Sequence, residues 1–140
     1  MAWIVKVGVN AYLTQSEMEN NATEFYGYFN SKGFTIESVA GMLGNLQHES
    51  NINPGMKQTA SASSGWGLIQ WTPSSNLTDY ATAYGVDWAT GEIQTQLMWD
   101  EIINGYGGQW KPKPSLGYDY TGAEFSQLTD VAEACKAYLY

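Results

Sequence analysis

The stretch TIESVAGMLGNLQHESNINP, residues 35 to 54, constrains the fold more than any other part of the chain. Thr35 can cap a helix, because its hydroxyl can accept a bond from a free N–H of the first turn. Five apolar residues then recur at helical spacing and would form one buried face: Ile36, Val39, Ala40, Leu43 and Leu46. Pro54 enforces a stop soon afterwards, because proline lacks a backbone donor and clashes with the preceding turn. The sequence therefore predicts a helix over residues 35 to 50.

Glu49 lies in the last turn of this predicted helix, where the helix dipole disfavours a negative charge. Asn45, one turn earlier, projects from the same side. Met42 and Leu46 would give Glu49 apolar neighbours, and both influences favour the protonated carboxyl that a general acid needs. On spacing alone, a solvated glutamate near a frayed helix end is the commoner explanation.

Two glycines, Gly41 and Gly44, interrupt the same predicted helix. Glycine inside a helix lowers stability relative to alanine. Their presence indicates that another chain segment or a ligand approaches this helix closely.

The rest of the chain reads as mostly helical. Thr14 and Glu17 have the form of a capping box, which predicts a helix to about residue 30. GWGLIQWTP, residues 65 to 73, reads as a short strand beside a glycine-rich turn. Further helices are expected at residues 75–84, 93–103 and 129–140. We therefore expect one α+β domain over residues 1–140, dominated by helices, with a small β-element after the helix that carries Glu49.

Composition excludes several functions. Six lysines, no arginine and fourteen acidic residues give a net charge of −8, so a basic face for nucleic acid can hardly be assembled. His48 and Cys135, the single histidine and cysteine, lie far apart and form no zinc spacing, so no metal and no cofactor is expected. No apolar run reaches membrane-spanning length, and a membrane span is not expected.

Aromatic residues are abundant, with six tryptophans and ten tyrosines along the chain. Most should pack in the core, but aromatic faces also stack on sugar rings. Trp66 and Trp71 both belong to the predicted β-element. One of the two is expected to contact sugar and the other to fill the core, and the sequence does not choose between them.

Three motifs resemble a known family. HES (48–50) followed by GWGLIQ (65–70) is similar to signatures of lysozyme-like muramidases and lytic transglycosylases. More closely, YLTQSEMENNA (12–22), GMLGNLQHESNINPG (41–55) and GWGLIQWTPSSN (65–76) together resemble the phage tail lysozyme family, tail-borne enzymes that open peptidoglycan at infection. The resemblance implies a lysozyme-like fold in the virion tail. It also implies bacterial peptidoglycan as substrate and other phage tail proteins as further partners.

The resemblance also implies roles for individual residues. Glu49 matches the family's catalytic glutamate, Gln70 the glutamine that faces the cleft, and Asn45 the polar residue one turn before the acid. Glu49 would then protonate the glycosidic oxygen between N-acetylmuramic acid and N-acetylglucosamine. Asn45 and Gln70 would form hydrogen bonds with the sugars, with Trp71 or Trp66 stacking on them. The alternative is a noncatalytic wall-binding module of a tail tip that keeps the fold.

A second carboxylate is not evident near the motifs, because residues 50 to 78 contain no Asp or Glu. The remaining candidates, which the sequence does not rank, are Asp79, Asp87, Asp100 and Glu101. A scheme with one acid, in which the substrate's own groups complete the reaction and leave anhydro ends, stays open beside hydrolysis. Members of the family that this chain resembles continue beyond the point that matches residue 140. We therefore expect additional residues or a further domain after residue 140.

Overall fold

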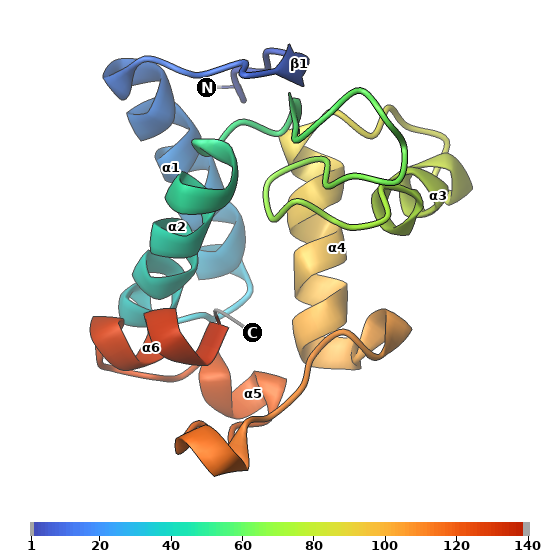
Figure 1. Ribbon diagram of the computed structural model, residues 1–140. Helices are drawn as coiled ribbons and strands as arrows, with labels where there is room; N and C mark the ends of the chain where they lie inside the picture. The colour runs from blue at the N-terminus through green and yellow to red at the C-terminus, as the bar shows by residue number, and fades with distance from the viewer. Residues whose placement is uncertain (1, 139–140) are drawn as a thin grey trace.

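The structure is a computed structural model that describes residues 2–138 (Figure 1). Its elements in chain order are β1 (Gly8–Val9), α1 (Gln15–Ser31), α2 (Ile36–Ser50), β2 (Met56–Lys57), α3 (Ser75–Ala83), α4 (Gly91–Asn104), the 3-10 turns η1 (Tyr106–Gly108) and η2 (Pro114–Leu116), α5 (Gly122–Phe125) and α6 (Val131–Tyr138). The predicted mostly helical α+β composition is confirmed. Within the described residues, no helix is both long and apolar enough to cross a bilayer.

The first two helices begin where their caps predict. Thr14 and Glu17 form a reciprocal capping box at the start of α1. The Thr35 side chain accepts a bond from the Ser38 backbone N–H at the start of α2. Figure 1 shows α1 and α2 side by side, forming one half of the molecule. The other half contains α3 and α4.

Helix α6 packs across α2, as Figure 1 shows, and the two helices come closest at Gly41. A Cβ added to Gly41 would lie 2.6 Å from the Cys135 backbone nitrogen and 2.7 Å from the Ala134 Cβ. A Cβ on Gly44 would lie 3.6 Å from the Cys135 Sγ. The expectation that a chain segment approaches these glycines is confirmed, and the segment is α6.

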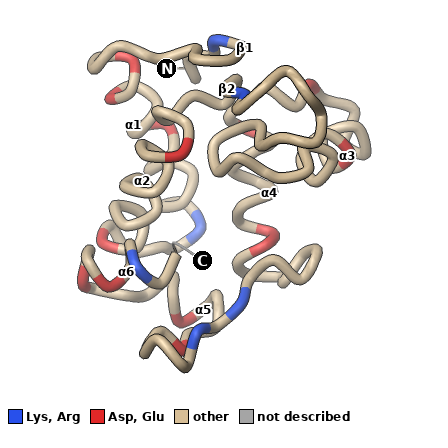
Figure 2. The backbone as a smooth tube through the Cα atoms, viewed as in Figure 1, with Lys and Arg blue, Asp and Glu red and all other residues tan. Residues whose placement is uncertain are grey.

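Acidic side chains outnumber basic ones in this chain. Figure 2 shows acidic residues on most of the helices, whereas lysines are sparse. Lys6 pairs with Glu17 at 2.9 Å and ties the N-terminal segment to α1, and it is the one ion pair within residues 2–138. The other lysines therefore have no carboxylate partner in the described part of the chain.

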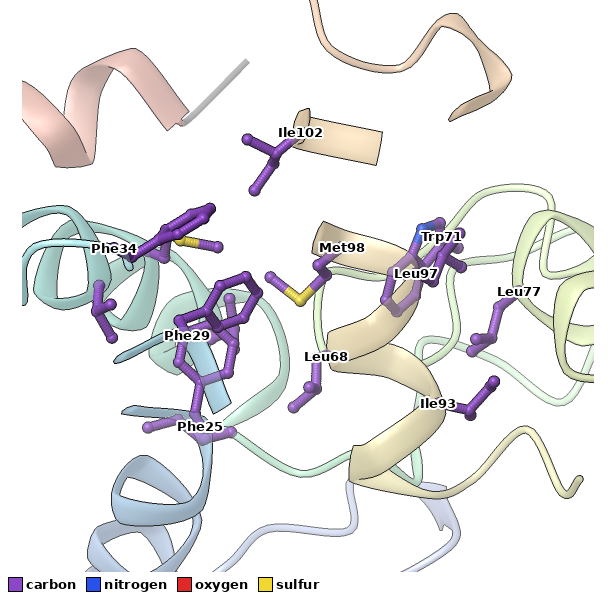
Figure 3. Packing of buried hydrophobic residues seen from close by; sticks show 14 of the residues in the cluster. Phe25, Phe29, Phe34, Leu68, Trp71, Leu77, Ile93, Leu97, Met98 and Ile102 are labelled. Atoms are coloured by element: carbon purple, nitrogen blue, oxygen red, sulfur yellow. The ribbon is translucent and has the colours of Figure 1, made fainter. Parts of the chain in front are cut away.

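The core lies between α1, α2 and α4. Phe25 and Phe29 of α1 pack against one another with their rings tilted by 42° and their centroids 4.8 Å apart, and both are fully buried. Met98 of α4 points toward these rings in Figure 3, while Leu97 lies beside Trp71. Because α4 packs on α3 in its own half and on α1 in the other half, it fixes the relative position of the two halves.

The small sheet differs from the expectation. It is a parallel pair in which Gly8 lies opposite Met56, and β2 follows α2 but comes before the segment for which the strand was predicted. The predicted strand at residues 65–73 is wrong, because this segment is a tight turn closed by backbone bonds between Trp66 and Trp71. Gly67 and Gln70 have φ angles of 89° and 55°, left-handed values that reverse the chain and are incompatible with an extended strand.

Candidate active site

A cavity of about 460 Å³ opens between the two halves of the molecule. Its walls are the C-terminal half of α2, the turn at 69–72 and the start of α3. The ends of α4 and α6 and residues 109–113 of the loop after α4 complete them. The residues lining it are Asn45, Glu49, Ile69, Gln70, Trp71, Thr72, Asn76, Glu101, Ile102, Gln109, Trp110, Lys111, Lys113 and Tyr138. A cavity of this size is in the range of ligand pockets.

Glu49 is the next-to-last residue of α2 and lines this cavity. Its position follows from the end of the helix, where Asn51 and Ile52 adopt left-handed φ angles of 59° and 56° before Pro54. The side chain is exposed and forms no hydrogen bond or ion pair with the described residues. Its carboxyl is therefore free to meet a ligand in the cavity.

Asn45 lies one turn before Glu49 and is buried, with 7% of its surface exposed. Its Nδ2 donates to the carbonyl oxygens of Gly41 and Cys135, both at 3.0 Å, so the amide ties α2 to α6. The nitrogen is committed to the fold. The oxygen remains as the atom that can accept a hydrogen bond from a ligand.

Gln70 is half-buried and also lines the cavity. Its Nε2 donates to the carbonyls of Gly67 at 2.8 Å and Met56 at 3.2 Å, which holds the turn against β2. The backbone of Gln70 is in the left-handed region, which is uncommon for a residue with a Cβ and occurs often at binding sites. As with Asn45, the amide oxygen is left for a ligand.

Ser50 connects the turn to the helix that carries Glu49. Its Oγ donates to the carbonyl of Leu68 at 2.7 Å and to that of Leu46 at 3.1 Å, and the side chain is buried. Ser50 therefore fixes the distance between two walls of the cavity. The sequence analysis did not assign it this role, although its place in the HES motif is a signal that it matters.

Glu101 is the carboxyl that α4 contributes to the cavity, and it is only 6% exposed. The indole N–H of Trp71 donates to its Oε2 at 3.0 Å. Burial raises the pKa of Glu101 to about 7, an effect that the bond from Trp71 opposes and the charge of Asp100 reinforces. This carboxyl can therefore exchange a proton near neutral pH.

Of the four second carboxylates considered above, Glu101 is the one that lines the cavity. Asp100 faces elsewhere and accepts bonds from the Tyr80 hydroxyl at 3.1 Å and from Asn104 Nδ2 at 2.8 Å. Asp79 and Asp87 are not among the lining residues. The sequence could not rank the four, because only the folded position of α4 brings Glu101 into the cavity.

The two candidate tryptophans occupy different places. Trp71 is 5% exposed, joins the core and forms part of the cavity wall. Trp66 lies outside the lining, where it packs on Trp88 with ring centroids 5.0 Å apart and Lys57 Nζ 4.1 Å from its ring. Trp71 is therefore the one of the pair that can contact a ligand in the cavity.

The loop after α4 supplies lining residues for which the sequence predicted no role. Trp110 donates its indole N–H to the Tyr120 carbonyl at 2.9 Å, and Lys113 Nζ donates to the Ala137 carbonyl at 2.8 Å. Lys111 lies between them in sequence and is exposed. One feature of the sequence could have pointed to this loop: two of the six lysines lie within three residues of one another.

The arrangement is suited to acid and base chemistry on a polar ligand. Two carboxyls, Glu49 and Glu101, share the cavity with two amide oxygens and an aromatic wall. A carboxyl can donate or accept a proton when it is within reach of the reacting atom. Within residues 2–138, no group of three or more His, Cys, Asp or Glu side chains gathers as a metal site.

Comparisons with known proteins agree with the motifs. A profile of the family described as phage tail lysozyme matches residues 20–140. Morphogenesis protein 1 of Bacillus phage B103 is 42% identical over 104 residues, which cover 72% of this chain and 28% of that protein. The chain thus spans 28% of the length of this relative. Since the profile matches well over half of the residues, the chain belongs to the phage tail lysozyme family.

Proposed function

We propose that this chain is a glycosidase of the lysozyme type. It cleaves the β-1,4 bond between N-acetylmuramic acid and N-acetylglucosamine in bacterial peptidoglycan. Family membership supports a peptidoglycan hydrolase in general, and the position of Glu49 supports the specific assignment. Glu49 combines a free carboxyl, a place in the cavity wall and a match to the family's motif.

In this proposal Glu49 acts as the general acid and gives its proton to the leaving glycosidic oxygen. The oxygens of Asn45 and Gln70 accept hydrogen bonds from sugar hydroxyl or acetamido N–H groups, since their nitrogens are already bonded within the fold. The small exposed part of Trp71 in the cavity wall gives a sugar ring an apolar contact. We propose that the fold is lysozyme-like. The substrate cleft then lies between the half formed by α1 and α2 and the half that carries the turn at 69–72.

Glu101 is the proposed second carboxyl of the reaction. Once ionised, it can stabilise the positive charge that develops on the sugar, or accept a proton from an attacking water. A pKa of about 7 leaves a substantial ionised fraction at neutral pH. If Glu101 takes no part, the substrate's own hydroxyl group completes the reaction and the product carries an anhydro end.

We place the enzyme in the phage tail, where it degrades the wall locally during infection. The family description and the phage origin of the relative support this location. Delivery by a particle also fits the net charge of −8, because a free acidic protein is repelled at long range by anionic wall polymers.

The decisive experiment is mass spectrometry of purified peptidoglycan digested by the parent protein, by Glu49→Gln and by Glu101→Gln. Glu92→Gln is the matched control, because Glu92 is exposed on α4 and outside the cavity. We expect muropeptides from the parent and from the control, and none from Glu49→Gln. The mass of the new sugar end distinguishes a reducing from an anhydro product, and the yield from Glu101→Gln shows whether the second carboxyl is needed.

Full activity of Glu49→Gln would overturn the assignment of the acid. A parent protein that binds glycan strands but releases nothing would instead support the wall-binding module of a tail tip.

A further inference from the structure

Two of the chain's six lysines, Lys111 and Lys113, line the cavity of an otherwise acidic protein. Both belong to the stretch that leads from α4 toward α5, on which Figure 2 shows basic segments. Neither has a carboxylate within ion-pair distance among residues 2–138, whereas Lys6 is paired with Glu17. Unpaired cations at the wall of a cavity are available to a negatively charged ligand.

Lys113 is held in place by contacts that do not neutralise it. Its Nζ donates to the carbonyls of Ala137 at 2.8 Å and Lys111 at 3.3 Å, and its backbone pairs with Tyr118 through bonds of 2.8 and 3.0 Å. An ammonium group has three donors, so one remains free. Burial lowers the pKa of Lys113, because desolvation opposes the charge and no carboxylate among residues 2–138 compensates for it.

The loop that carries both lysines is anchored to the core. The indole N–H of Trp110 donates to the Tyr120 carbonyl at 2.9 Å, and its ring packs on Phe125 with centroids 5.1 Å apart. The backbone of the loop is thus held in place at Trp110, and the Lys113 cation is also held by its own hydrogen bonds. A fixed cation loses less conformational freedom on binding an anion than one on a mobile loop.

We propose that Lys111 and Lys113 form a carboxylate-binding subsite at the edge of the cavity. The inference rests on the proposed function, because peptidoglycan strands are the substrate that brings carboxylates to this cleft. These occur on the lactyl group of muramic acid when it is free of peptide, and on the stem peptide when it is attached. Oligomers of N-acetylglucosamine have neither. The subsite therefore favours wall glycan over neutral chitin-type glycan and offsets the repulsion from the net charge of −8.

The test is a set of dissociation constants measured by calorimetry in the Glu49→Gln background, which keeps the glycans intact. Three glycans are compared: strands with stem peptides, strands whose peptides have been removed by an amidase, and a neutral N-acetylglucosamine hexamer. Lys111→Gln and Lys113→Gln are each compared with Lys136→Gln. Lys136 is an exposed lysine of α6 and lies outside the cavity. Lys136→Gln therefore removes the same charge without changing the cavity.

We expect Kd for the carboxylate-bearing strands to rise about threefold to tenfold with either cavity variant, and Kd for the hexamer to stay constant. A rise with peptide-free strands assigns the lactyl carboxylate, and a rise confined to intact strands assigns the stem peptide. Equal changes for all three glycans, or no change with Lys111→Gln, would overturn the proposal. Lys111 is exposed, so Lys111→Gln should fold normally. It keeps the test decisive if Lys113→Gln fails to fold.

The outcome is independent of cleavage. If the parent protein proves unable to cut any glycan, the proposed glycosidase fails while these binding constants still decide whether the subsite exists. If the parent cuts peptidoglycan and the binding constants do not depend on Lys111, the subsite fails alone.

Discussion

Trp71 donates its indole N–H to Oε2 of Glu101 at 3.0 Å, and the two side chains are only 5% and 6% exposed. The bond joins the turn at 69–72 to α4 across the floor of the cavity. The bond also gives the buried carboxyl of Glu101 a neutral hydrogen-bond donor rather than a positively charged partner. Burial therefore has the largest effect on the pKa of Glu101 and raises it, while this bond opposes the shift and the charge of Asp100 reinforces it.

Glu101→Gln should change how stability depends on pH. The pKa of Glu101 is raised from an ordinary 4.5 to about 7, so between these values the unfolded chain loses its proton before the folded chain does. Stability therefore falls as pH rises through this window and stays lowered above it, by on the order of 3 kcal/mol. Glutamine keeps an acceptor for Trp71 and cannot ionise. Urea unfolding at pH 4.5 and pH 8 should show a smaller loss for Glu101→Gln than for Glu92→Gln, and equal losses would contradict the assignment.

Trp71→Phe should raise the pKa of Glu101 further. The indole N–H stabilises the ionised carboxylate, and phenylalanine keeps an aromatic ring but has no donor. The carboxyl carbon of Glu101, followed by NMR through a pH titration, should titrate above the parent value. Trp66→Phe is the matched control, since Trp66 lies outside the cavity. A titration unchanged by Trp71→Phe would mean that the hydrogen bond contributes little to the ionised state.

Gly41→Ala should destabilise the fold, whereas Gly27→Ala should not. A Cβ at Gly41 would lie 2.6 Å from the Cys135 backbone nitrogen, so α6 must move away from α2. Gly27 is also inside a helix, but a Cβ there meets nothing within 4 Å. We expect Gly41→Ala to lower the free energy of unfolding by about 1–3 kcal/mol. Gly27→Ala should raise it by about 0.5–1 kcal/mol. Calorimetry measures both, and equal effects would show that α6 does not pack tightly on α2.

The sequence predicted the features that depend on local physics. The capping residues Thr14 and Thr35 began their helices as expected, because a cap is decided by a few neighbouring residues. Gly41 indicated a close packing partner but could not identify it, since α6 lies about ninety residues further along the chain. The partner of a residue is a property of the whole fold.

The errors arose where tertiary structure overrides pattern. Residues 65–73 have the composition of a strand, but the left-handed backbone of Gly67 and Gln70 turns the chain back on itself. Glu101 could not be chosen among four acids, because its place in the cavity depends on how α4 packs. No role was predicted for Lys111 and Lys113, because they lie in a loop that reaches the cavity only through the fold. The Glu49 motif was recognised because its residues are close together in sequence.

Ser50→Ala should weaken the connection between the helix that carries Glu49 and the turn that carries Gln70. Ser50 is 1% exposed, and its hydroxyl is bonded to the Leu68 carbonyl at 2.7 Å. Removing it leaves a buried carbonyl without this donor, which costs about 1–3 kcal/mol of unfolding free energy. Ser63→Ala, at an exposed serine, should cost less than about 0.5 kcal/mol.

Ser50→Ala should also reduce the rate of glycan release at temperatures where the protein is still fully folded, because the two walls of the cavity are no longer held at a fixed separation. The measurement is the yield of muropeptides alongside a thermal melt. A variant that is less stable but releases muropeptides at the parent rate would show that Ser50 supports only the fold. Loss of rate without loss of folded protein would show that Ser50 positions Glu49 relative to the turn.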